Sequence, residues 1–297
     1  MELTVVIPSY NTEDTLGATL DALAVQVGCG EFEVVVVDCS DDDRVERLAA
    51  GRSRVRVLRR RKRFNPGEGR NIGAAAAQGK LLVFVDADVT LRADALSAAM
   101  AYHQLGHRVF GGALELNEAR ANIASFLEHY FFNHESQIGR PPCLRSNLSS
   151  ALMVVERVLF VTEGGFRDIP RMQDTEFSER LARNGITLTF TPTVVGFQIQ
   201  DAPIPKVLRK VYISGRNTYS IRYGRASSLQ RAAFCVLLPL ISAAKTIRII
   251  GRHLRYQDFR RRLITLAISP HLAVAGACWM LGFYGALIFK SGISRER

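Results

Sequence analysis

Three short runs of apolar, largely β-branched residues limit most strongly what this chain can fold into. The runs cover residues 3–8, Phe32–Asp38 and Leu81–Val85. Leucines at helical spacing recur between the first two runs, and an alanine-rich stretch precedes the third. Strands that alternate with helices form β-α-β units, and a strand buried on both faces is a continuous apolar run. The sequence therefore predicts an α/β sheet of the nucleotide-binding type in its first half.

Polar residues follow each of the three runs at the point where the predicted strand ends. Ligands of such sheets bind beyond the carboxyl ends of the parallel strands. We therefore expect the three polar segments to meet in one crevice. They are Ser9-Tyr10-Asn11, Asp38-Cys39-Ser40 and Asp86-Ala87-Asp88.

Asp86 and Asp88 are the strongest chemical signal in the sequence. Two carboxylates two residues apart, where the chain leaves the extended form, can both reach one divalent ion, and Mg²⁺ or Mn²⁺ prefers oxygen ligands shared with substrate phosphates. The alternative is that both residues cap a helix that begins near Ala93. The sequence thus predicts a metal site, with a helix cap as the other interpretation.

Two further features favour nucleotide binding. Asp38, at the end of the second run, is well placed to accept hydrogen bonds from a nucleobase or ribose. In the segment 67–73, small residues allow a close approach to the backbone, a helix N-terminus follows, and Arg70 supplies a planar cation for phosphate. The segment lacks the G-x-G-x-x-G opening that a Rossmann fold carries directly after its first strand.

These motifs resemble the family-2 glycosyltransferases of the GT-A fold, in particular bacterial, membrane-associated members. The resemblance covers about residues 1–195 and follows the order and spacing of the family. It implies an α/β fold, the GT-A nucleotide-diphospho-sugar transferase fold, with a mostly parallel central sheet flanked by helices. The motifs are residues 5–11, 36–40 and 69–73, Asp86-Ala87-Asp88, Gly164-Gly165-Phe166 and Gln173-Asp174-Thr175-Glu176-Phe177.

The resemblance also implies roles for the residues of the donor side. The side chains from the first strand would line the nucleotide pocket, the second strand end would bind the base, and the third would contact the ribose and a divalent Mg or Mn ion. The implied donor-binding residues are Pro8, Tyr10, Asp38, Arg70 and Asp86, and the implied metal ligands are Asp86 and Asp88.

On the acceptor side, the resemblance implies that Asp174 is the general base that faces the acceptor hydroxyl. The other interpretation is a cap for a helix over residues 175–184. The sequence departs from the family at Gln173, where the family usually carries Glu, and at Cys39, where it often carries Asp; an aspartate in the segment 41–43 could compensate for the second departure.

The last third of the chain is basic and apolar, which accounts for much of the net charge of +11. Lysines and arginines alternate with apolar residues in the segment 205–228, as in helices that lie in a headgroup layer. Membrane-bound relatives place an arginine near the donor diphosphate here, which implies Arg216 as a further donor-binding residue. We therefore divide the chain into a catalytic domain at 1–204 (nucleotide half 1–110, acceptor half 111–204), an interfacial segment at 205–228 and membrane-associated helices at 229–297.

Residues 263–289 carry no Asp, Glu, Lys or Arg and are long enough for a hydrocarbon core of ~30 Å, which needs ~20 residues. The earlier stretch, 232–250, is interrupted by Pro239, Lys245 and Arg248. We expect it to be re-entrant or interfacial, because two spans would place an arginine-rich loop outside, against the positive-inside rule. Two full spans are the alternative. No secretory signal is recognisable, and the five cysteines show no C-x-x-C pair, so we expect the catalytic domain on the cytoplasmic side of the inner membrane.

The sequence thus predicts an enzyme that transfers a sugar from a nucleoside diphosphate sugar to a membrane-proximal acceptor, lipid or lipid-linked, with inversion and a divalent metal. The alternatives are a polyprenyl-phosphate glycosyltransferase, a nucleotidyltransferase acting on a sugar phosphate, and a membrane-tethered scaffold without turnover. A nucleic-acid partner is not expected, because the basic run 59–63 has no interleaved aromatics and no recognised reader motif.

Overall fold

The computed structural model describes residues 1–169 and 171–289. It divides into two compact units. The first contains Met1–Glu115 and Ile138–Ile199, and the second contains Leu116–Gln137 and the chain from Gln200 onward.

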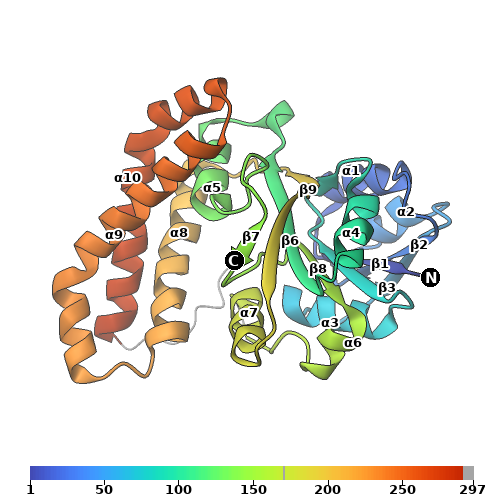
Figure 1. Ribbon diagram of the computed structural model, residues 1–297, viewed down its shortest axis with the longest axis horizontal. Coiled ribbons are helices and arrows are strands. Elements are labelled where there is room, and N and C mark those ends of the chain that lie inside the picture. The colour runs from blue at the N-terminus through green and yellow to red at the C-terminus, as the bar shows by residue number, and fades with distance from the viewer. Residues whose placement is uncertain (170, 290–297) are drawn as a thin grey trace. The chain divides into compact units, whose positions relative to one another are not determined.

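The first unit is built on one mixed sheet with helices on both of its faces (Figure 1). The strands are β1 (Leu3–Ser9), β2 (Phe32–Asp38), β3 (Val55–Arg59), β4 (Leu81–Val85), β5 (Val89–Leu91), β6 (Val109–Leu116), β7 (Cys143–Arg145), β8 (Leu152–Glu156) and β9 (Leu188–Gln198). Their order is β3-β2-β1-β4-β8-β6-β9-β5, and β7 pairs with β9. The first four strands run parallel, whereas β8 is antiparallel to its neighbours β4 and β6. The predicted α/β sheet is confirmed, with an antiparallel half added to its parallel half.

The alternation of side chains along the strands creates two cores, one on each face of the sheet. The helices are α1 (Glu13–Ala24), α2 (Arg44–Ala49), α3 (Pro66–Ala76), α4 (Ala95–Gln104), α6 (Arg157–Thr162) and α7 (Gln173–Arg183). In β1, Val5 and Ile7 pack with α1, α2 and α4, whereas Val6 packs with α3, α6 and α7. Burial on both faces explains the continuous apolar run of four valines, residues 34–37, that precedes Asp38 in β2.

Helix α3 lies against the parallel strands because it carries glycine at its points of contact. A Cβ atom on Gly73 would lie 2.3 Å from Cγ1 of Val6. At the start of the helix, the Asn65 side chain accepts the backbone N–H of Glu68 as an N-cap. The helix therefore begins at Pro66, before the alanine-rich segment from which the sequence predicts it.

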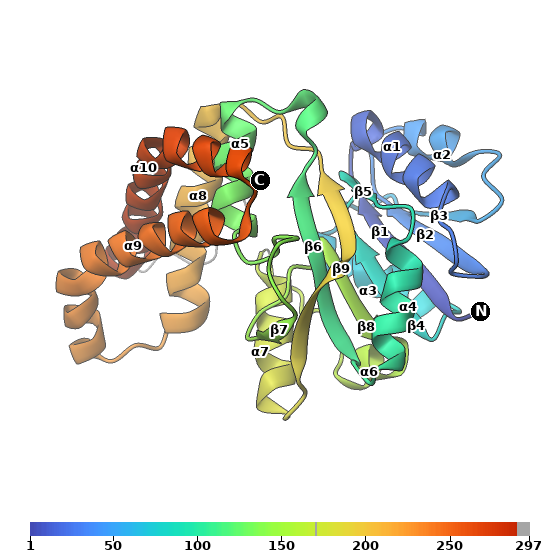
Figure 2. The same cartoon turned by 45° about the horizontal axis from the view of Figure 1, so that its top comes forward.

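The second unit is a group of helices in which α8, α9 and α10 lie side by side (Figure 2). Its elements are the 3₁₀ turn η1 (Glu118–Arg120), α5 (Ile123–Asn133), α8 (Ile204–Thr218), the π-helical turn η2 (Tyr219–Tyr223), α9 (Ser228–Tyr256) and α10 (Phe259–Phe289). The backbones of α8 and α10 touch, since a Cβ atom on Gly282 would lie 1.9 Å from the carbonyl oxygen of Tyr212. Small residues at such contacts are typical of helices packed in membranes.

Two features of the second unit differ from the sequence-based expectations. The segment Leu116–Gln137, which we placed in the acceptor half of the first domain, groups with the C-terminal helices because Leu127 and Tyr130 of α5 belong to their apolar core. In addition, α9 is one continuous helix through Pro239, so its backbone does not take the re-entrant form. Of the possible forms of α9, an interfacial helix and a spanning helix remain.

Candidate functional site

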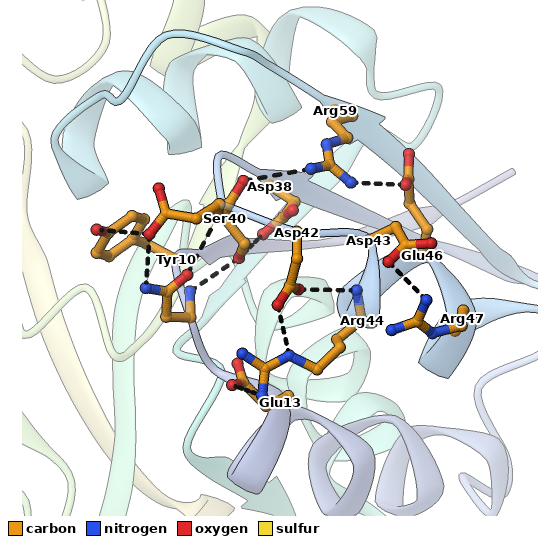
Figure 3. Close-up of polar contacts among 12 residues, drawn as sticks. Tyr10, Glu13, Asp38, Ser40, Asp42, Asp43, Arg44, Glu46, Arg47 and Arg59 are labelled. Carbon is orange, nitrogen blue, oxygen red and sulfur yellow. Dashed lines mark hydrogen bonds and ion pairs between the residues drawn. The ribbon is translucent and has the colours of Figure 1, made fainter.

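The Asp38 carboxylate is fully buried at the carboxyl end of β2. Ser40 Oγ donates to its Oδ1 atom at 2.6 Å, and the same hydroxyl accepts the backbone N–H of Asn11 at 2.8 Å (Figure 3). Within the described part of the chain, the Oδ2 atom has no hydrogen-bond donor. A buried carboxylate oxygen without a donor is costly. This oxygen is therefore suited to accept a hydrogen bond from a ligand.

Tyr10 lies beside this carboxylate, at the end of β1. Its hydroxyl donates to Oδ2 of Asp41 at 3.3 Å, and Nδ2 of Asn11 donates to the same oxygen at 3.1 Å. The Arg63 guanidinium lies 4.0 Å from the centroid of the Tyr10 ring. The ends of β1 and β2 therefore form one polar cluster, as the sequence predicts.

Asp41 is the aspartate of the segment 41–43 that contacts this cluster. Asp42 instead accepts from Arg44 Nε at 2.6 Å, and Asp43 accepts from Arg47 Nη1 at 2.6 Å (Figure 3). Both pairs are exposed, and exposed ion pairs contribute ~0 to 1 kcal/mol. Of the three candidates to compensate for Cys39, Asp41 is thus the one in contact with Tyr10.

Arg70 is a nearly buried cation, 4% exposed, on the second turn of α3. Its Nη2 atom forms an ion pair with Oδ1 of Asp86, which follows β4 and is one-third exposed. The guanidinium lies 5.9 Å from the centroid of the Phe166 ring. Its Nε atom has no hydrogen-bond acceptor among the described residues. The buried cation thus keeps one N–H group for a further anion.

Asp88 lies on the same turn as Asp86, two residues further on. The Nε2 atom of Gln198, at the end of β9, lies 3.3 and 3.4 Å from its two carboxylate oxygens. Within the described residues, no group of three or more His, Cys, Asp or Glu side chains could hold a metal ion. Two carboxylates on one turn provide the hard oxygen ligands that Mg²⁺ or Mn²⁺ prefers, and such ions usually take their remaining ligands from phosphate and water.

Asp174 lies in the first turn of α7 and is partly buried. Its Oδ2 accepts the backbone N–H of Ser150 at 3.3 Å, and its Oδ1 accepts that of Thr175 at 2.7 Å. Burial raises the pKa of the Asp174 carboxyl above its ordinary value and the Asp86 charge adds to this, whereas the two N–H groups and the Arg70 charge lower it. The helix begins two residues earlier than expected, at Gln173, so Asp174 is not its N-cap residue; that position belongs to Met172.

The structure thus gathers the predicted residues of the first unit at one edge of the sheet. Asp86 and Arg70 are in direct contact, and both act electrostatically on Asp174. Pro8 lies in β1, against α3, where a Cβ atom on Gly69 would be 3.2 Å from Cβ of Pro8. Arg216 belongs to α8 of the second unit, and its role stays a prediction.

Residues 4–148 match the sequence model described as "Glycosyl transferase family 2". This part of the chain is a glycosyl transferase family 2 domain. The match includes the ends of β1, β2 and β4, with Asp38, Asp86 and Asp88, and stops before α7. The family expected from the motifs is confirmed.

Curated relatives resemble about a third of the chain. The poly(ribitol-phosphate) beta-N-acetylglucosaminyltransferase TarS of Staphylococcus aureus is 34% identical over 107 residues, 34% of this chain and 19% of TarS. The succinoglycan biosynthesis protein ExoO of Rhizobium meliloti is 35% identical over 96 residues, 32% of this chain and 28% of ExoO. The matched regions therefore span less than a third of these relatives.

Solved structures extend the likeness in fold to nearly the whole chain. The mannosyltransferase PcManGT from Pyrobaculum calidifontis, in complex with GDP-Man and Mn²⁺, gives a TM-score of 0.63 at 17% identity and covers 98% of this chain and 88% of that chain. TarS residues 1–349 from S. aureus, in complex with UDP-GlcNAc, give 0.53 at 18% identity over 95% of this chain and 89% of that one. The GT-A fold of the family-2 domain is thereby confirmed.

Sequence reasoning missed the side chains that support the site. Asn65, the N-cap of α3, and Asn71 within that helix bond to the segment that leads into α7, and Ser40 bonds to Asp38. The sequence feature that could have indicated Ser40 is its position, two residues after the end of the second predicted strand. The bonds of Asn65 and Asn71 span about a hundred positions in the sequence, and no local pattern indicates them.

Proposed function

We propose that this chain transfers a sugar from a nucleoside diphosphate sugar to an acceptor hydroxyl, with Asp174 as the general base. The observation that carries the proposal is the meeting of Arg70, Asp86 and Asp174 at one edge of the sheet. A cation for phosphate, a carboxylate for a metal and a carboxylate with a raised pKa are the groups that such a displacement needs.

The donor nucleotide is proposed to bind across the ends of β1 and β2. The unpaired Oδ2 of Asp38 would accept an N–H group of the base, and Pro8 and Tyr10 would line the pocket. Two structural relatives were solved with nucleotide sugars, UDP-GlcNAc for TarS and GDP-Man for PcManGT. These support a nucleotide-sugar donor for this chain, with either base.

A divalent ion is proposed to accompany the donor, held by Asp86 and Asp88. Both carboxylates lie on the turn after β4, and PcManGT was solved in complex with GDP-Man and Mn²⁺. When bound, the ion supplies positive charge to the departing diphosphate. Arg70 also supplies positive charge to the diphosphate, because its buried guanidinium has one N–H group, at Nε, that bonds to none of the described residues.

The proposed reaction is a single displacement at the anomeric carbon. Asp174 takes the proton of the acceptor hydroxyl while the oxygen of that hydroxyl bonds to the anomeric carbon. At the same time, the bond from that carbon to the diphosphate oxygen breaks. One displacement inverts the configuration of the sugar. The backbone N–H groups of Ser150 and Thr175 hold the carboxylate in place for this step.

The acceptor is proposed to be a lipid or a lipid-linked molecule at the cytoplasmic membrane. Among the described residues, α9 and α10 are long and apolar enough to cross a membrane, and only 22% and 44% of their most apolar windows are buried. Exposed side chains such as Leu240 and Leu281 leave an uncovered apolar surface that lipid would cover. Residues 205–228 would then lie at the interface, with Arg216 near the donor diphosphate.

A donor screen tests the proposal. The full chain in detergent is incubated with a panel of UDP-, GDP- and dTDP-sugars and a membrane lipid extract, and release of the nucleoside diphosphate is measured with Mn²⁺ or with EDTA. We expect metal-dependent release of the diphosphate from one donor. Consumption of a nucleoside triphosphate and a sugar phosphate, with release of pyrophosphate, would instead show a nucleotidyltransferase. No turnover of any donor would contradict the proposal.

A further inference from the structure

The segment that leads into α7 is tied to helix α3 by side-chain hydrogen bonds. Asn71 of α3 bonds to both backbone groups of Phe166: its Nδ2 donates to the carbonyl oxygen at 2.6 Å, and its Oδ1 accepts the N–H at 2.9 Å. An amide that pairs with both groups of one residue fixes the position and the orientation of that peptide. Phe166 is buried, so this tie lies at the edge of the core.

A second tie joins the N-terminal ends of the two helices. Gln173, the first residue of α7, donates from Nε2 to the carbonyl oxygen of Ile169 at 2.7 Å and to Oδ1 of Asn65 at 3.3 Å. Asn65 in turn donates from Nδ2 to Asp168 at 2.7 Å. The contact is close, because a Cβ atom on Gly67 would lie 2.9 Å from Cγ of Gln173.

The tied residues directly adjoin the groups of the proposed reaction. Asn71 follows Arg70 on α3, and Gln173 precedes Asp174 on α7. A change in the first turn of α7 would therefore move the Asp174 carboxylate relative to Arg70 and Asp86. A displacement of ~1 Å in a reacting group can reduce a rate by ~10²-fold.

Position 173 needs a donor, which explains why it carries an amide. Both groups that Gln173 contacts, the Ile169 carbonyl and Oδ1 of Asn65, are acceptors. The Asn65 amide is oriented by its own bonds, since Oδ1 accepts from the Glu68 N–H at 2.9 Å. An ionised glutamate at position 173 would face two acceptors without a proton to donate, although its shape is the same.

We infer that Asn71 and Gln173 are positioning residues for sugar transfer: they hold the first turn of α7 on α3 and so fix Asp174 relative to Arg70 and Asp86. This inference rests on the proposed role of Asp174 as the base. It goes beyond that role because it assigns a function to two residues that the proposed reaction itself does not use.

The test compares Asn71→Ala and Gln173→Glu with the control variant Asn184→Ala. Asn184, at the other end of α7, also holds a side-chain bond, from its Nδ2 to Glu163 at 2.7 Å. For each full-length variant in detergent, kcat, KM for the acceptor, donor affinity and melting temperature are measured. We expect kcat to fall ~10- to 10²-fold in the first two variants with donor affinity unchanged, and the control to keep its kcat.

A pH profile separates positioning from folding. In Gln173→Glu, the new negative charge beside Asp174 should move the acidic limb of kcat/KM to higher pH, which loss of stability alone does not do. Wild-type kcat in both variants, or an equal loss in Asn184→Ala, overturns the inference and leaves the proposed function standing. Absence of transfer by the wild-type chain with every donor overturns both.

Discussion

At the scale of single residues, the Asp38 carboxylate has only one of its two oxygens hydrogen-bonded within the part of the chain that the structure describes. One oxygen is satisfied by Ser40, and the other is buried without a donor among the described residues. A buried oxygen without a donor destabilises the folded protein, and a ligand that donates a hydrogen bond to it removes this cost. A donor molecule with an N–H group in its base would supply this bond.

Asp38→Asn tests this account of the donor pocket. The variant keeps an oxygen for Ser40 but presents an NH₂ group where the ligand would donate. Hydrogen bonds to charged groups contribute ~1.5–3 kcal/mol, so we expect donor affinity to fall about 10- to 150-fold. Isothermal titration of the nucleoside diphosphate measures this, and unchanged affinity would remove Asp38 from the pocket. The melting temperature should not fall, because the variant removes a buried charge.

The residues of the site were predictable where they lie at or just after the end of a strand, and less so elsewhere. Asp38, Asp86 and Asp88 follow apolar runs, so the sequence places them at one edge of the sheet. The partners of Asp88 and Asp174 were not predictable, because Gln198 and Ser150 come from distant strands and loops. The departure at Gln173 could be noted in the sequence, but its reason required the position of Asn65.

At the scale of elements, helix α3 is held on the sheet by a glycine contact. In an exposed helix, Gly→Ala stabilises by ~0.5–1 kcal/mol. At Gly73 the added Cβ would lie 2.3 Å from Val6, so we expect Gly73→Ala to destabilise by ~1–3 kcal/mol. Gly17→Ala in α1 is the matched control, since its nearest atom is 3.8 Å away, on Leu48. In thermal unfolding, Gly73→Ala should lower the melting temperature and Gly17→Ala should raise it. Equal shifts of the two melting temperatures would contradict the packing argument.

Helix α9 continues through Pro239 because a neighbouring helix replaces the missing hydrogen bond. Pro239 cannot donate to the carbonyl of Cys235, four residues earlier. The Tyr284 hydroxyl of α10 donates to that carbonyl at 2.8 Å. The sequence shows the proline but not the hydroxyl group that compensates for it.

A double-mutant cycle tests the compensation. We expect Tyr284→Phe to cost ~1 kcal/mol in the wild-type background, because it leaves the Cys235 carbonyl without a donor. In Pro239→Ala, the alanine N–H restores the helical bond, so the same change should cost much less. Unfolding of the four proteins in detergent gives the coupling energy, and additive effects would show that Tyr284 does not compensate for the proline.

At the scale of the whole molecule, the two units differ in how far the sequence predicts them. The family-2 match covers residues 4–148, and the parallel half of the sheet in the first unit was predictable from three apolar runs. Strands β3, β5, β6 and β7 were not predicted. Strand β3 gives a weak signal because it is only partly buried and mixed with arginines. The composition of the second unit was predictable as apolar and basic, whereas the membership of α5 in its core depends on contacts across ~100 positions.

Membrane association is tested by extraction. We expect the full chain to stay in the membrane fraction after carbonate treatment, since α9 and α10 expose apolar surface. A charge facing lipid costs ~2.5–3.5 kcal/mol, so a variant with Leu240→Glu and Leu281→Glu should be released in part. Leu240 and Leu281 are 68% and 56% exposed; Leu105→Glu, at a 75% exposed position of the first unit, is the control. Complete release of the wild-type chain would exclude embedded helices.

The central claim is that Asp174 is the base of a sugar transfer, and the rate of Asp174→Asn measured against pH tests it most directly. A base acts in its ionised form. Because the pKa of Asp174 is raised above its ordinary value of 3.8, wild-type kcat/KM should increase as pH rises through that raised pKa. In Asp174→Asn, this limb should vanish and transfer should fall ~10²- to 10⁴-fold, with donor affinity and melting temperature close to wild type. Near-normal transfer by the folded variant, with the acidic limb intact, would contradict the account and make Glu176 the next carboxylate to test.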